Sequence, residues 1–108
     1  MNSSGAVAAL AALAQETRLA VFRRLVTAGP AGLSAGHIAD SLAVPAATLS
    51  FHLKELRVAG LVTRRKRGRS LIYAADYRGI DSLVGFLMDN CCRQPAGRQE
   101  LEERTPQP

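Results

Sequence analysis

Basic side chains are concentrated in one stretch of the chain, from Lys54 to Arg69. Seven of the sixteen residues in this stretch are basic, and Glu55 is the only acidic one. A dense group of cations displaces the counterions condensed on a phosphate backbone, which is the main source of nonspecific affinity for DNA. The net charge of +5 agrees with such a role. We therefore predict contacts with DNA for seven residues: Lys54, Arg57, Arg64, Arg65, Lys66, Arg67 and Arg69.

Four helices are predicted ahead of the hairpin from the spacing of apolar residues and from the residues that start and stop a helix. The first covers about 6–14, with Val7 and Leu10 on its apolar face, and the second carries Leu19 and Val26 among its apolar repeats. The first helix is weakly polar and therefore needs a partner surface.

The third and fourth helices come next, and the basic stretch begins within the fourth. Ser34 is expected to cap a helix at about 35–42, and Pro45 to begin one at about 45–59, because the first turn of a helix tolerates a missing N–H. The short link between them predicts a helix-turn-helix. The fourth helix is expected to bury three leucines: Leu49, Leu53 and Leu56.

A hairpin and a last helix follow. The two β-leaning runs are Leu61–Thr63 and Leu71–Ala74, and the cationic segment Arg64–Ser70 joins them through a turn at Gly68. An apolar stripe at intervals of three and four predicts a helix over Tyr77–Cys92.

The length and composition favour a single domain. With 108 residues and 47% apolar content, the chain can close one modest core but hardly two. We predict a domain over 1–93 and a disordered tail over 94–108, which is rich in charge and proline. No apolar run approaches the roughly 18 residues of a membrane span, and the N-terminus has no basic signal-peptide region, so a cytoplasmic protein is expected.

The predicted fold is mainly α with a β-hairpin, in the order α-α-α-α-β-β-α, and it resembles the winged helix-turn-helix repressors of the ArsR/SmtB family. Three motifs carry the resemblance, Leu13–Leu19, Leu49–Val62 and Gly68–Tyr73, within a likeness that covers about 10–92. The resemblance implies a homodimer joined through its first and last helices. It also implies binding to a roughly palindromic double-stranded DNA operator, with release by a metal, metalloid or other signal.

The recognition helix departs from the family pattern at its start. Many members have polar residues where this chain has Pro45-Ala46-Ala47, and alanines offer only apolar contact. Phe51 has two open roles: contact with a thymine methyl group in the major groove, or packing against the hairpin. Base readout is therefore predicted to rest on four residues: Thr48, Ser50, Phe51 and His52.

Cys91 and Cys92 form the only cluster of soft ligands in the sequence. Adjacent cysteines cannot link distant parts of a fold, which excludes a disulfide scaffold. Their position resembles that of sensing thiols in a variant group of the family. Thiolates are soft ligands that suit trivalent arsenic or antimony, so we predict Cys91 and Cys92 as metal ligands. These ions typically take three sulfurs, so the third ligand would be an exogenous thiol such as glutathione, a cysteine of the other subunit or a non-sulfur donor. Neighbours on a regular helix diverge by about 100°, so the helix must fray at Asn90 or Cys91.

Several alternatives remain open at this point. The cysteine pair could undergo reversible oxidation or have no sensing role, which would leave a redox-responsive or a ligand-independent DNA-binding protein. A small thiol reductase is disfavoured because a helix C-terminus does not stabilise a thiolate, so no enzyme activity and no required cofactor are expected. A zinc site built from His37, Asp40 and His52 is also disfavoured.

Overall fold

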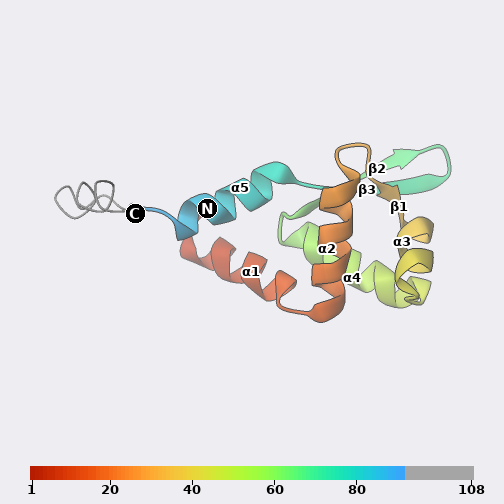
Figure 1. Cartoon of the computed structure of the whole chain (residues 1–108), viewed down its shortest axis with the longest axis horizontal. Coiled ribbons are helices and arrows are strands. Elements are labelled where there is room, and N and C mark those ends of the chain that lie inside the picture. The colour runs from red at the N-terminus through yellow and green to blue at the C-terminus, as the bar shows by residue number, and fades with distance from the viewer. Residues whose placement is uncertain (92–108) are drawn as a thin grey trace, which may run out of the picture.

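The computed structural model describes residues 1–91, which form five helices and a three-stranded antiparallel sheet (Figure 1). The predicted tail, 94–108, lies outside the described residues. Figure 1 shows α1 and α5 side by side at one end, α2 and α4 in the middle, and α3 with the hairpin at the other end. The elements are α1 (Ser3–Leu13), α2 (Glu16–Ala28), β1 (Leu33–Ser34), α3 (Ala35–Leu42), α4 (Ala46–Val58), β2 (Val62–Arg67), β3 (Ser70–Ala75) and α5 (Tyr77–Leu87).

Side-chain caps define the start of four of the five described helices. The side chain of Ser34 accepts a hydrogen bond from the N–H of His37 at 3.1 Å, which confirms the predicted start of α3. Asn2, Gln15 and Asp76 cap α1, α2 and α5 in the same way. The α4 helix begins after Pro45 without a side-chain cap. Each cap satisfies an N–H that has no partner within its own helix.

The core lies where α2, α3 and α4 meet. Leu49, Leu53 and Leu56 of α4 are all at most 1% exposed, as the leucine spacing predicted. They pack with Leu25 of α2 and Ile38 of α3, which are also fully buried. The α4 helix is therefore fixed along one face, and its opposite face is left to solvent.

The sheet has the order β1-β3-β2, with β2 at one edge. The predicted hairpin is confirmed, but its strands are longer than predicted: Val62 pairs with Ala75 and Arg67 with Ser70, so the turn is reduced to Gly68 and Arg69. The basic residues at positions 64–67 thus lie on a strand and not in a loop. An exposed edge strand needs no alternation of apolar and polar residues, and for this reason the sequence pattern did not reveal it.

The short strand β1 was missed altogether. Leu33 and Ser34 pair with Tyr73 and Ile72 of β3, and two residues are too few to give a periodic signal. Gly32 permits this pairing, since it has φ +74° and a Cβ at this position would collide with the carbonyl oxygen of Tyr73.

The apolar faces of α1 and α2 differ from those predicted. In α1 the buried residues are Ala6, Ala9 and Ala12, while Val7 is 65% exposed and Leu10 is 43% exposed. In α2 the predicted apolar residues Phe22 and Leu25 are buried, whereas Leu19 and Val26 are exposed. Small alanines let α1 approach its neighbours closely, so the larger side chains point outward.

The last helix ends earlier than predicted. The α5 helix stops at Leu87, and Asn90 adopts a left-handed conformation with φ 68°, so the break precedes Cys91. Leu83 is buried, whereas Val84, Leu87 and Met88 are more than half exposed. No single helix within residues 1–91 has the length and apolar character to cross a membrane, although α1 and α2 together, bent by 97°, meet those criteria as a pair.

Candidate nucleic-acid interface

The outward face of α4 carries most of the residues predicted to read bases. Counting 100° per residue, Ala47, Phe51, Lys54 and Val58 fall along the line opposite the buried leucines. All four are exposed, as are Thr48 and Ser50 on either side of this line. Four of the predicted side chains therefore share one accessible surface: Thr48, Ser50, Phe51 and Lys54.

The β2–β3 hairpin, or wing, carries the densest group of exposed cations. It projects beyond α3 at the end of the molecule away from α1 and α5 (Figure 1). Arg65 donates a hydrogen bond from Nη2 to the carbonyl oxygen of Ala31 at 2.9 Å, which ties the wing to the turn ahead of β1. The remaining cations extend from an edge strand and its turn, a geometry suited to following a phosphate backbone. The exposed basic residues of the wing are Arg64, Arg65, Lys66, Arg67 and Arg69.

The assignment of His52 to the DNA-contacting surface needs correction. Its side chain is only 9% exposed, and its Nδ1 lies 3.2 Å from Nη1 of Arg18. The spacing explains this position, because His52 follows Leu49 by three residues and precedes Leu56 by four, which places it beside the buried stripe. Arg57 is also half-buried, and its Nε is shielded without a hydrogen-bond partner among the described residues.

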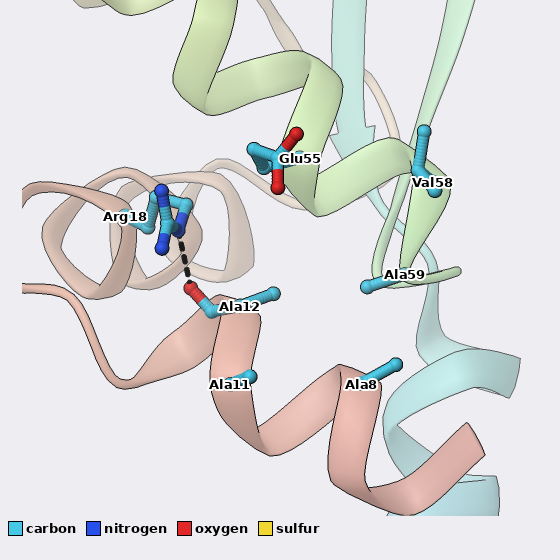
Figure 2. A pocket seen from close by; sticks show the side chains of 7 residues that line it. All are labelled: Ala8, Ala11, Ala12, Arg18, Glu55, Val58 and Ala59. Carbon is cyan, nitrogen blue, oxygen red and sulfur yellow. Dashed lines mark hydrogen bonds between the residues drawn. The ribbon is translucent and has the colours of Figure 1, made fainter. Parts of the chain in front are cut away.

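Arg18 connects α4 to the corner between α1 and α2. Its Nε donates to the carbonyl oxygen of Ala12 at 2.7 Å (Figure 2). Its Nη1 donates to Nδ1 of His52 on α4 at 3.2 Å. A guanidinium has no acceptor, so the His52 ring must be neutral with its proton on Nε2. Burial lowers the pKa of His52 below its ordinary value of 6.5, the charge of Arg18 lowers it further, and Glu55 opposes both effects.

A hollow of about 270 Å³ lies beside this connection. Figure 2 shows small side chains of α1 on one wall and the C-terminal half of α4 on the other, with Arg18 and Glu55 at one end. Neither Arg18 nor Glu55 was predicted to take part in a contact between helices, since an arginine and a glutamate on amphipathic helices give no signal of one. The lining residues are Ala8, Ala11, Ala12, Arg18, Glu55, Val58 and Ala59.

Of the two predicted metal-binding cysteines, Cys91 alone lies within the described residues. Cys91 is exposed, and its N–H donates to the carbonyl oxygen of Met88 at 2.8 Å. Cys92 lies outside the described residues. His37 and Asp40 are exposed on α3, whereas His52 is buried on α4. Among residues 1–91, no group of three or more His, Cys, Asp or Glu side chains is arranged to hold a metal ion.

Known proteins resemble the chain both in sequence and in fold. A helix-turn-helix domain family matches residues 13–65. The chain is 32% identical over 92 residues to the transcriptional activator HlyU of Vibrio cholerae. This alignment covers 85% of the chain and 82% of HlyU. The chain is also 41% identical over 80 residues to a putative arsenical resistance operon repressor, ArsR, of Halobacterium salinarum. That alignment covers 74% of the chain and 61% of the repressor. The chain spans 58% and 61% of the length of two of the curated relatives that it matches.

Solved structures extend the likeness to the whole winged domain. The structure of HlyU from Vibrio cholerae matches with a TM-score of 0.67 at 32% identity, over 84% of this chain and 96% of that one. An ArsR-like transcriptional regulator from Rhodococcus sp. RHA1 matches with a TM-score of 0.73 at 26% identity, over 93% of this chain and 92% of that one. The shared region includes α4 and the wing, the two elements of the candidate interface.

Proposed function

The chain belongs to the ArsR/SmtB family of winged-helix transcriptional regulators, and we propose that it is a repressor that binds a double-stranded DNA operator as a homodimer. The observation that carries this proposal is the joint exposure of one face of α4 and of the cationic wing. The buried leucines of α4 hold that face in a fixed orientation. A recognition helix of this kind enters the major groove, while cations on a wing contact the adjacent backbone.

Exposed apolar side chains on α1 and α5 support dimerisation. Val7 and Leu10 project from α1, and Val84, Leu87 and Met88 project from α5, which contacts α1. A monomer that left this surface in water would be prone to associate. A twofold dimer through these helices would carry two copies of α4, and its operator would have half-sites about 34–36 Å apart.

The dependence of DNA binding on salt tests the role of the wing. We would measure fluorescence anisotropy on DNA from the region upstream of the coding sequence, at several salt concentrations, for the native protein, Arg67→Ala and the matched control Arg78→Ala. Arg78 is an exposed arginine in the first turn of α5, beyond the end of β3 that lies farthest from the turn of the wing. Each phosphate contact contributes about 0.9 to the slope of log K against log salt, so two copies of Arg67 should account for about 1.8. Equal slopes for Arg67→Ala and Arg78→Ala would show that Arg67 of the wing contacts no phosphate. A native protein that binds no DNA would refute the proposed function.

For the inducer, we propose trivalent arsenic or antimony bound by Cys91 and Cys92, with an exogenous thiol as the third ligand. Thiophilic ions suit this pair, and the exposure of Cys91 beyond the end of α5 supports access. Each arsenic–sulfur bond would form as a thiol loses its proton and a hydroxide of arsenite leaves as water. An ion that binds the free dimer more tightly than the DNA-bound dimer must weaken DNA binding by the same factor.

The inducer proposal is tested with arsenite and glutathione in the same anisotropy assay. Arsenite should release the native protein from DNA and leave a Cys91→Ser, Cys92→Ser double variant bound. If both proteins stay bound, this pair is not the arsenite sensor, and DNA binding by the native protein would still support the proposed repressor.

A further inference from the structure

Phe51 is the largest apolar side chain on the outward face of α4. It is 56% exposed, with Ala47 one turn before it and Lys54 one turn after it. The ring meets His52 edge-on, with centroids 5.6 Å apart and an angle of 61° between the planes. This contact leaves more than half of Phe51 exposed to solvent. Packing against the hairpin, one of the two roles considered above, would bury the ring, and an exposure of this size shows that the hairpin does not cover it in this structure.

The surroundings of Phe51 favour apolar contacts with bases. Ala47, at the start of the same exposed face, has no hydrogen-bonding side chain. In the major groove, thymine alone among the four bases presents a methyl group, and alanine, phenylalanine and the methyl group of threonine are the side chains that contact it. Ala47, Thr48 and Phe51 bring these three types together within two turns of α4.

The charges around Phe51 indicate which partner covers it. Lys54 lies on the same face of α4, and the wing, whose strand β2 contacts α4, adds five exposed cations. A hydrophobic protein partner would have to be placed among these like charges. A DNA duplex supplies both the phosphates that the cations require and a groove edge for the ring.

We propose that Phe51, together with Ala47, selects a thymine in each operator half-site through the C5-methyl group of that base. This inference rests on the proposed DNA-binding function and adds to it a specificity-determining residue. It also implies that 5-methylcytosine, which carries a methyl group at the corresponding edge of the groove, satisfies the same apolar contact. Uracil, which differs from thymine only by that methyl group, does not.

The test removes the methyl group from the DNA and the ring from the protein, separately and together. Duplexes retained by the native protein would first be selected from a random library, and each thymine would then be replaced by deoxyuridine. Loss of one buried methyl group should raise the Kd about fourfold, and loss from both half-sites about sixteenfold. For Phe51→Ala, the thymine and uracil duplexes should bind equally well.

Val58→Ala is the matched control. Val58 is 74% exposed on the same face of α4, two turns closer to the C-terminus. This variant should keep the full uracil penalty. Because both side chains are exposed, both variants should fold, which circular dichroism would verify.

Three results would overturn the inference. The native protein could tolerate uracil at every thymine, or Phe51→Ala could keep the native uracil penalty; in either case DNA binding itself would stand. Phe51→Ala could instead convert a dimer to a monomer in size-exclusion chromatography, which would assign Phe51 to a protein interface. If the native protein retains no duplex from the library, the proposed function fails together with this inference.

Discussion

Replacing Gly79 by alanine probes how α5 is seated against the turn after α4. Gly79 is the third residue of α5, and a Cβ there would collide with the carbonyl oxygen of Gly60. Neither the backbone around Gly60 nor the first turn of α5 can move easily. The N–H of Asp76 donates to the carbonyl oxygen of Leu61 at 2.9 Å, and the Asp76 carboxylate caps the first turn of α5. The added methyl group must therefore displace backbone and not merely a flexible side chain.

The expected size of this effect follows from two opposing contributions. Overpacking of a fitted site costs about 1–3 kcal/mol, while replacing glycine by alanine in a helix gains at most about 1 kcal/mol. Gly36, the second residue of α3, is the matched control, because a Cβ there meets nothing within 4 Å. At equal protein concentration, thermal unfolding should place Gly79→Ala about 5–15 °C below Gly36→Ala. If the two variants melt together, α5 is not held against Gly60 as described.

Two further predictions concern the core and its buried histidine. Leu25→Ala should lower the free energy of unfolding in urea by about 2–5 kcal/mol, since Leu25 is fully buried between the helices; a loss below about 1 kcal/mol would contradict its place in the core. The pKa of His52 is lowered in the folded chain, so the unfolded chain takes up the proton first as the pH falls. Stability should therefore be complete above about pH 6.5 and decline as the pH drops from there towards the folded-state pKa. His52→Gln should lose this part of the decline, and an unchanged pH profile in that variant would refute the assignment.

The helix-turn-helix was largely predictable from the sequence. Its signals are local: Ser34 caps α3, Pro45 precedes α4, and the spacing of Leu49, Leu53 and Leu56 fixes the buried face of α4. The same spacing makes Thr48, Ser50 and Phe51 outward-facing. Local chemistry and burial agree in this region, so a reading of the sequence was sufficient.

Features that depend on tertiary contacts were harder to predict. The two residues of β1 form a strand only because β3 lies beside them. The alanine face of α1 is buried because close packing outweighs the greater hydrophobicity of Val7 and Leu10. His52 was assigned to DNA from its residue type, although its position beside the leucine stripe already indicated burial.

Arg18 forms hydrogen bonds to both of the helices that the proposed function requires, α1 and α4. Through Ala12 it is bonded to α1, which shares the exposed apolar surface with α5, and through His52 it is bonded to α4, which carries the candidate recognition face. The two acceptors are on different helices and the guanidinium is rigid, so a displacement of α1 relative to α4 must stretch one of these bonds or carry both helices along. The ring of Phe51 contacts the same histidine ring, with the two centroids 5.6 Å apart. One arginine and one neutral imidazole therefore form a continuous chain of contacts between α1, which carries part of the exposed apolar surface, and the outward face of α4.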